Sequence, residues 1–301
     1  MYQNAKEKRH FFLDHPILFG IGCLVLSSFL SIVILVPVFF WTDPYSPAGT
    51  FAAFAVHGLL AGAFALLFKK ALGMGYVIGF TGRHLILSLT LGWIFIPVSL
   101  VNLYADDLIP SGFLHLTLRA VLIALFSAAG AAVSEEILFR GIIAGSMMRV
   151  WGRLAKGIYA VFTASSLLFG AFHALNAVQD GFTPALWWQM AYTCAMGLVY
   201  AAVYLRTKNL WGPVILHGLL DFTGFLGAAG HENVDPVTEV LSSFVSAEAA
   251  LFYCVITAVF TAAAIWLLRP EKLAEIRAVW NGDHQEKNQT SPPALPQTAK
   301  A

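Results

Sequence analysis

Six ionisable side chains lie inside strongly apolar stretches of the chain, where they could perform acid–base chemistry within a membrane. Three of them, Glu135, Glu136 and Arg140, occur within residues 134–141. Glu136 and Arg140 are four residues apart and share one face of a helix, whereas Glu135 points about 100° away from Glu136. We therefore expect Glu136 and Arg140 to form a structural ion pair and Glu135 to remain available as a general base. The alternative is that the whole cluster is an ion pair at a helix end.

The other three ionisable side chains are two histidines and an aspartate. His173 ends a small, apolar segment that begins at Phe169, and a lone histidine of this kind is more often a packed, hydrogen-bonded residue than a catalyst. His217 and Asp221 are four residues apart, so the carboxylate could orient the imidazole, or both could bind one metal ion. At about 1.5 Å per residue, Glu135, His173 and Asp221 come out at similar depths and His217 comes out shallower. The three segments can therefore share one buried site.

The elements expected to position these residues are membrane helices. The chain has 301 residues, of which 58% are hydrophobic and 12% charged, and its mean hydropathy is +0.72. This composition excludes an ordinary soluble globular domain, and the formal net charge of +1 does not indicate a nucleic-acid partner. The apolar windows predict an all-α, polytopic transmembrane bundle of about eight spans, near residues 17–41, 51–68, 84–103, 116–148, 158–176, 185–205, 210–229 and 248–268.

Charged residues predict the orientation of this bundle. When successive segments are laid alternately on the two sides of the membrane, the loops on one side are basic and the loops on the other side are acidic. The basic side is expected to be cytoplasmic, with both termini there. We therefore expect a cytoplasmic N-terminus over residues 1–16, a transmembrane domain over 17–269 and a polar, disordered tail over 270–301. Arg119, near the outer end of the fourth span, can snorkel to the interface.

The order and spacing of the buried motifs resemble the CPBP family of CAAX proteases and bacteriocin-processing, Abi-like enzymes. This family includes the type II CAAX prenyl endopeptidases. The resemblance covers about residues 115–230, which would form a CPBP-like core within the bundle. Three motifs carry it, each on a separate expected helix: Glu135-Glu136-x-x-x-Arg140, Phe169-x-x-x-His173 and His217-x-x-x-Asp221.

The resemblance also implies a role for each of these residues. It implies a glutamate-type intramembrane endopeptidase in which Glu135 and His173 activate water. His217 and Asp221 would line the pocket that stabilises the oxyanion. The supporting residues would be Glu136, Arg140 and Phe169.

Asp221 departs from the family's pattern, because prenyl-processing members carry asparagine at this position. An asparagine can donate a hydrogen bond to an oxyanion, whereas an ionised aspartate cannot. Asp221 could be protonated, could orient His217 so that the imidazole alone donates, or could bind a metal. A zinc ion held by Glu135, His173, His217 and Asp221 would suit these ligand types, but the chain lacks an HExxH-like spacing. The resemblance implies a metal-independent mechanism, so we expect no cofactor.

These observations predict an intramembrane endopeptidase that hydrolyses a peptide bond in a membrane-associated substrate near the cytoplasmic side of the bilayer. The substrate would be a peptide or a membrane protein, which could carry the prenyl group of a CAAX-type substrate. We expect a multi-pass protein of a bacterial cytoplasmic membrane, surrounded by the lipid bilayer and without a nucleic-acid partner. Two alternatives use the same residues: a non-proteolytic scaffold or bacteriocin-immunity protein, and a proton-coupled transporter.

Overall fold

The computed structural model describes residues 14–70, 79, 82, 84–114, 116–177, 181–229 and 247–280, with the backbone alone for 247–250. Residues 1–13 of the expected N-terminus, 281–301 of the expected tail and the acidic segment 230–246 lie outside the described residues. Within the described residues every regular element is a helix, which confirms the all-α prediction. The elements are α2 (Pro16–Phe39), α3 (Pro47–Lys70), α4 (Leu85–Leu91), α5 (Phe95–Ala105), α6 (Leu118–Glu136), the π-helix η2 (Ile137–Ala144), α7 (Gly145–Trp151), α8 (Ala155–Phe172), η3 (His173–Asn176), α10 (Pro184–Thr207), α11 (Trp211–Ala228), α13 (Ala247–Leu267) and η5 (Pro270–Lys272).

The helices are long and apolar enough to make this an integral membrane protein. In the part of the chain that the structure describes, four continuous helical segments meet the length and hydropathy of a membrane span: α2, α3, Leu118–Trp151 and Ala155–Asn176. The number rises to six if each of two bent pairs is one span: α4 with α5, bent by 60°, and Leu251–Leu267 with Pro270–Trp280, bent by 49°. All eight apolar segments expected from the sequence are helical. Eight membrane crossings remain a prediction.

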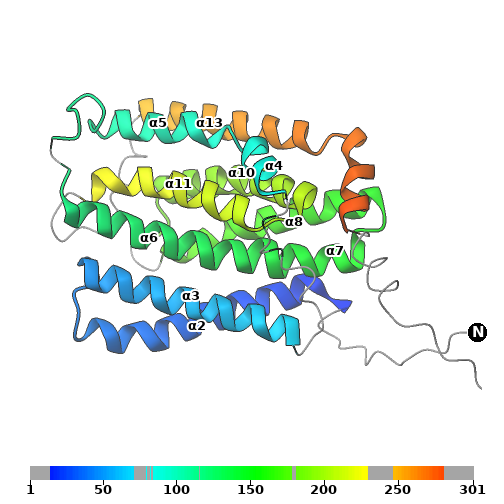
Figure 1. The fold of residues 1–301 in the computed structure, drawn as a ribbon, viewed down its shortest axis with the longest axis horizontal. Coiled ribbons are helices and arrows are strands. Elements are labelled where there is room, and N and C mark those ends of the chain that lie inside the picture. The colour runs from blue at the N-terminus through cyan, green and yellow to red at the C-terminus, as the bar shows by residue number, and fades with distance from the viewer. Residues whose placement is uncertain are drawn as a thin grey trace, which may run out of the picture.

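Helices α10 and α11 are long enough to span a membrane but are not apolar enough to be counted as candidate spans, and they occupy the middle of the bundle. Figure 1 shows them between α5 and α13 on one side and α6 on the other. Residues 199–207 of α10 are all buried, and this helix packs on α8 and α13. Helix α11 packs on α6 and α5. A helix that is surrounded by other helices does not need a continuous lipid-facing surface.

The two helices that carry most of the candidate residues, α6 and α11, therefore lie side by side. Thr117 caps the start of α6, because its hydroxyl accepts a hydrogen bond from the backbone nitrogen of Ala120 at 3.1 Å. The α-helical hydrogen bonding ends at Glu136 and changes to the π-helix η2, whose eight residues are all buried. Such π-turns are rare and are often found at functional sites.

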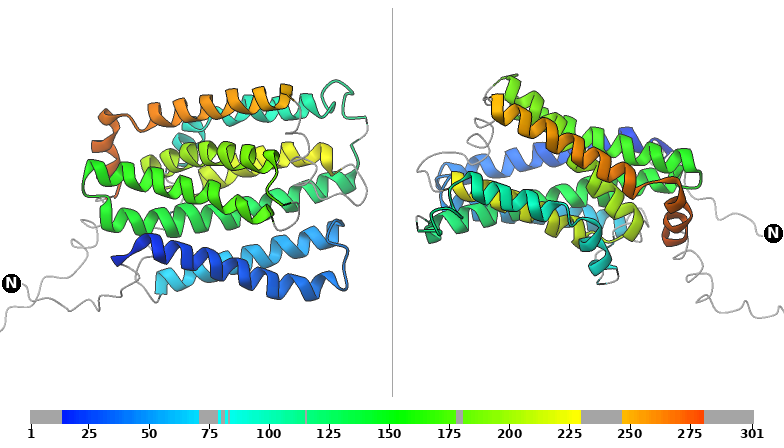
Figure 2. Two further views of the ribbon diagram at one scale, coloured as in Figure 1. Left: turned by 180° about the vertical axis from the view of Figure 1, so that it is seen from behind. Right: turned by 90° about the horizontal axis from the view of Figure 1, so that it is seen from above.

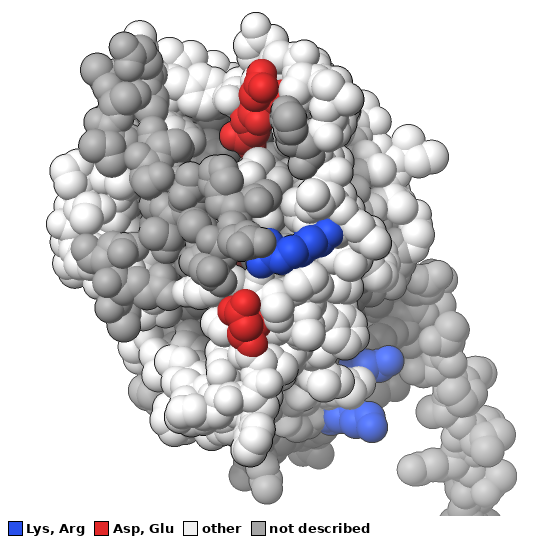
Figure 3. Space-filling model, turned by 90° about the vertical axis from the view of Figure 1, so that its left-hand side faces the viewer, with Lys and Arg blue, Asp and Glu red and all other residues white. Residues whose placement is uncertain are grey.

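Basic residues lie in the last turn of two helices at one end of the bundle, and an acidic residue caps α5 at the other end. Lys69 and Lys70 end α3 and Arg149 lies in the last turn of α7, and both helices end on the right in Figure 1. Helix α5 ends on the left, with Asp106 as its C-cap residue. Figure 3 looks onto this left-hand end and shows a few acidic and basic side chains among the mostly uncharged residues that the structure describes there. Here Arg119 donates a hydrogen bond to the carbonyl of Tyr45 at 3.2 Å.

The prediction of a disordered tail from residue 270 is wrong for residues 270–280, which are helical. The bend after α13 is visible from three sides in Figures 1 and 2. Leu273, Ile276 and Trp280 lie on one face of this segment and are buried. The indole nitrogen of Trp280 donates to the carbonyl of Leu205 at 2.9 Å. An amphipathic turn docked on α10 explains why the polar composition of this region did not lead to disorder.

Candidate active site

The centre of the site is a buried ion pair between Glu136 and Arg140. A nitrogen of the Arg140 guanidinium lies 2.9 Å from Glu136 Oε1, and the two side chains are 1% and 0% exposed. The pair predicted from the four-residue spacing is therefore present. Arg140 also donates to the carbonyl of Gly197 at 3.2 Å, and its guanidinium lies 4.3 Å from the centre of the Phe169 ring. Arg140 thus links η2 to both α8 and α10.

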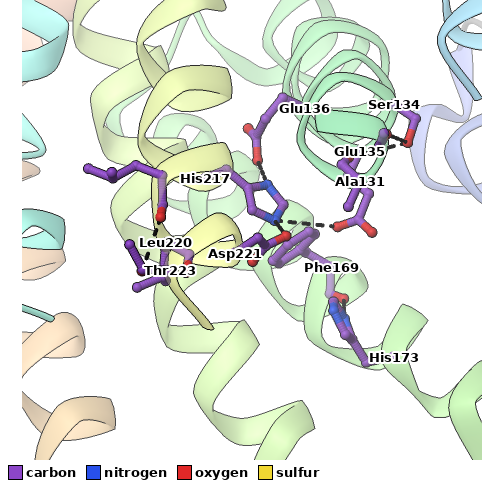
Figure 4. A network of polar contacts seen from close by, with 12 residues as sticks. Ala131, Ser134, Glu135, Glu136, Phe169, His173, His217, Leu220, Asp221 and Thr223 are labelled. Atoms are coloured by element: carbon purple, nitrogen blue, oxygen red, sulfur yellow. Dashed lines mark hydrogen bonds and ion pairs between the residues drawn. The ribbon is translucent and has the colours of Figure 1, made fainter. Parts of the chain in front are cut away.

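His217 brings α11 to this ion pair. Its Nδ1 lies 2.9 Å from Glu136 Oε1, and its Nε2 lies 3.2 Å from Asp221 Oδ2. Figure 4 shows the imidazole between the carboxylates of Glu136 and Asp221. The contact predicted between His217 and Asp221 is present. The sequence assigned Glu136 to the arginine alone, whereas the structure shows that the same oxygen also holds His217.

This geometry restricts where protons can lie. A carboxylate can only accept hydrogen bonds, and a neutral imidazole donates from only one of its nitrogens. His217 is therefore an imidazolium that donates twice, or one of its two carboxyl partners carries a proton. In the first case the charges of Glu136, Arg140, His217 and Asp221 cancel in pairs. Glu135 is then the one carboxylate of this cluster without a counter-charge of its own.

Glu135 has the position expected of an available carboxylate. Its side chain is 19% exposed, and its Oε2 lies 4.0 Å from His217 Nε2. This oxygen is buried and has no hydrogen-bond partner among the described residues. Figure 4 shows the Glu135 carboxylate directed away from Glu136, toward the side where Asp221 meets the imidazole. Asp221 is 18% exposed, whereas His217 is only 4% exposed. Water and substrate can therefore reach Glu135 and Asp221 more easily than His217.

The depth estimate from the sequence placed His217 shallower than Glu135, yet in the structure the two side chains are neighbours. The estimate took the start of each helix as the membrane boundary. The start of α11 is covered by protein instead. The backbone nitrogen of Leu210 donates to the carbonyl of Gly79 at 2.8 Å, and a Cβ on Gly212 would collide with the Ser88 side chain. Helix α11 therefore begins inside the bundle and not at the membrane boundary.

His173 lies apart from the other predicted site residues. It is the C-cap of α8 and the first residue of η3. Its Nδ1 lies 3.0 Å from the carbonyl of Phe169, so Nδ1 carries a proton and Nε2 of the neutral ring has a free lone pair. Among the described residues no hydrogen bond or ion pair joins His173 to Glu135 or His217. The Phe169 ring contacts both imidazoles edge-on, with centroid distances of 5.2 Å to His173 and 5.9 Å to His217.

The candidate zinc ligands do not form a compact set in this arrangement. In the part of the chain that the structure describes, no three His, Cys, Asp or Glu side chains are placed to hold one metal ion. A metal-independent site remains our prediction.

Two residues of α10 belong to the site and were missed by the sequence analysis. Gly197 contributes its carbonyl to Arg140, and a Cβ at this position would lie 3.0 Å from Phe169 Cδ1 and 3.4 Å from Arg140 Nη2. Tyr200 lies against His217, with ring centroids 5.2 Å apart and an interplanar angle of 22°. Both residues are uncharged and belong to an apolar helix, so no ionisable residue marked this helix as part of the site. Their three-residue spacing on one helical face was the only available signal.

Comparisons with known proteins agree with the resemblance read from the motifs. Residues 117–223 match the family described as "Type II CAAX prenyl endopeptidase Rce1-like". Over 89 residues the chain is 33% identical to a protein of Bacillus subtilis (strain 168) named "Putative membrane peptidase YdiL". This alignment spans 30% of each of the two chains. No solved structure matches the chain. The family match contains the six ionisable residues that the sequence singled out, whereas α2 to α5 and α13 lie outside it.

Proposed function

Starting from the match of residues 117–223 to the Rce1-like endopeptidases, we propose that this chain is a glutamate-type intramembrane endopeptidase. The observation that carries the proposal is the state of Glu135. Its Oε2 accepts no hydrogen bond from the described residues and lies 4.0 Å from His217, in a cluster whose other charges can cancel. A carboxylate that lacks a hydrogen bond on one oxygen and whose side chain is 19% exposed is suited to remove a proton from water.

The reaction that we propose begins when Glu135 accepts a proton from a water molecule. The hydroxide character of this water allows it to attack the carbonyl carbon of the scissile peptide bond. His173 is the second group that helps to activate the water. Its Nδ1 is held by the Phe169 carbonyl, so the free lone pair on Nε2 is the part of the ring that can act, through water. The proton on Glu135 then passes to the departing amine, which restores the carboxylate.

Negative charge develops on the carbonyl oxygen during the attack. The Nε2–H group of His217 is the donor that we propose for this oxyanion. In the free protein this group faces Asp221 at 3.2 Å, so donation to the oxyanion requires the hydrogen bond to be shared or exchanged. The opposite nitrogen remains anchored on Glu136. Asp221 therefore acts as the orienting group and not as a second donor.

The substrate that we propose is a membrane-associated peptide or protein that carries a prenyl group of the CAAX type. The description of the matching family supports this substrate class. The similarity to a Bacillus subtilis protein supports a bacterial cytoplasmic membrane as the location. We propose the lipid bilayer as the only other partner, and neither a nucleic acid nor a cofactor.

The test uses the purified full-length protein in proteoliposomes and two synthetic peptides of one sequence, one farnesylated at cysteine and one unmodified. Mass spectrometry follows the products. We expect wild type to cleave the farnesylated peptide and Glu135→Gln to lose cleavage while it still inserts into membranes. Glu275→Gln is the matched control, because this acid lies at the docked C-terminal turn and contacts Arg206 and Lys272. It should cleave at the wild-type rate.

Two outcomes separate the parts of the proposal. Cleavage by Glu135→Gln at the wild-type rate would overturn the mechanism. Equal cleavage of the unmodified peptide would overturn the prenyl requirement alone. A correctly inserted wild-type protein that cleaves neither peptide would instead favour the scaffold or immunity alternative, and Glu135-dependent solute flux without cleavage would favour transport.

A further inference from the structure

Tyr200 is the buried aromatic residue of α10 that faces the imidazole of His217. It is fully buried, and its hydroxyl has no hydrogen-bond partner among the described residues. An unpartnered hydroxyl in a membrane interior contributes nothing favourable to stability. The ring of Tyr200 is therefore the part of the side chain that has a purpose at this position.

The hydrogen bonds of His217 do not by themselves fix the tilt of its ring. Both contacts, to Glu136 and to Asp221, are made by ring nitrogens, whose hydrogen bonds lie near the ring plane. Contacts on the faces of the imidazole must limit its tilt. Tyr200 supplies such a contact at an interplanar angle of 22°, and Phe169 meets the imidazole at 86°.

Tyr200 is itself clamped from the other side. Phe95 of α5 stacks on it with ring centroids 4.5 Å apart and an interplanar angle of 9°. Phe260 of α13 packs on Phe95 at 5.0 Å. Both α5 and α13 lie outside the segment that matches the family. These rings therefore connect the peripheral helices to the matched core at His217.

Electrostatics favour the same arrangement. The face of an aromatic ring carries partial negative charge and attracts a cation. The guanidinium of Arg140 lies 5.1 Å from the centre of the Tyr200 ring. A protonated imidazole stacked on this ring would gain from the same attraction, whereas an aliphatic side chain offers none.

We propose that Tyr200 is a positioning residue that holds the plane of His217, and that Phe95 keeps Tyr200 in place. The expected effect on kcat rests on the proposed function, whereas the expected effect on the orientation of the His217 ring does not. A small tilt of His217 moves Nε2 away from the position where it would meet the oxyanion. Misplacement of a catalytic group by about 1 Å can reduce the rate roughly a hundredfold.

The experiment compares three variants of the full-length protein in nanodiscs. Tyr200→Phe keeps the ring, and Tyr200→Leu removes it. Tyr204→Leu is the matched control, because Tyr204 is equally buried on α10 and faces Trp280 instead of the site. The readouts are kcat and KM on the farnesylated peptide, and the ¹⁵N chemical shifts of the His217 ring. The His217 signals are assigned by their loss in His217→Gln.

We expect Tyr200→Leu to lower kcat by about tenfold or more with little change in KM, and to shift the His217 signals. Tyr200→Phe and Tyr204→Leu should leave both readouts close to wild type. Unchanged His217 signals in Tyr200→Leu would overturn the proposal, as would equal losses in Tyr200→Phe or Tyr204→Leu. If wild type cleaves no peptide, the proposed function fails, but the chemical shifts still decide whether Tyr200 positions His217.

Discussion

Arg140→Met is the substitution whose effect follows most directly from the structure. It removes the hydrogen bonds to Glu136 and to the Gly197 carbonyl and leaves a side chain that fills a similar volume. Glu136 then remains 0% exposed and shares one imidazole with Asp221, so the buried cluster has an excess negative charge. Removing one partner of a buried ion pair costs about 3–5 kcal/mol.

This cost is large enough to measure by thermal unfolding. A loss of 1 kcal/mol lowers Tm by about 2–4 °C in domains of about 150–250 residues. We therefore expect Arg140→Met to lower the apparent Tm by on the order of 10 °C. Intrinsic fluorescence of the protein in nanodiscs measures this unfolding. Arg269→Met is the control, because Arg269 is 33% exposed and its nitrogen lies 3.8 Å from Glu271. Exposed pairs of this kind contribute about 0–1 kcal/mol.

A double variant tests whether the buried charge is the cause. E136Q/R140M removes both charges at once and leaves His217 paired with Asp221. Replacing a buried ion pair by neutral groups of similar size is often close to neutral. The double variant should therefore recover most of the stability that Arg140→Met loses. The reasoning is refuted if Arg140→Met unfolds within about 2 °C of wild type, or if the double variant is the less stable of the two.

Three further predictions concern backbone packing, the orienting acid and pH. Gly197→Ala should lower the free energy of unfolding by about 1–3 kcal/mol and should lower activity, because the new Cβ would lie 3.0 Å from Phe169 and overpack the site. The control is Gly62→Ala, where nothing lies within 4 Å of the new Cβ, and it should leave Tm unchanged or raise it. Asp221→Asn should keep most of the cleavage rate and Asp221→Ala should lose it, because the amide oxygen can still orient the imidazole; equal rates for the two variants would contradict the orienting role. Partial burial at the end of α5 raises the pKa of Asp106 from its usual value near 3.8 to about 6, so the folded state binds more protons than the unfolded state between these values. Stability should therefore fall as pH rises from about 4 to about 6 and stay level above that, and Asp106→Asn should abolish this part of the pH dependence of Tm.

The sequence by itself determined the helical class and the pairs of side chains that lie on one helix. Apolar stretches of sufficient length cannot satisfy their backbone groups in lipid except as helices, so each expected segment was found as a helix. The pairs Glu136–Arg140 and His217–Asp221 followed from a spacing of four residues, which places side chains on one face. The divergence of Glu135 from its neighbour followed from the same geometry.

Only the tertiary structure decided how these helices combine. Packing of α11 on α6 placed Glu136 against His217, 81 residues away, and burial of the start of α11 brought His217 level with Glu135. No local pattern encodes such contacts, because they depend on which faces of two helices meet. The same reason explains why Tyr200 was missed and why the similar depths of His173 and Glu135 did not show that the two residues lie apart. Spacing within a helix is fixed by backbone geometry, whereas spacing between helices is fixed by the packing of all their side chains together.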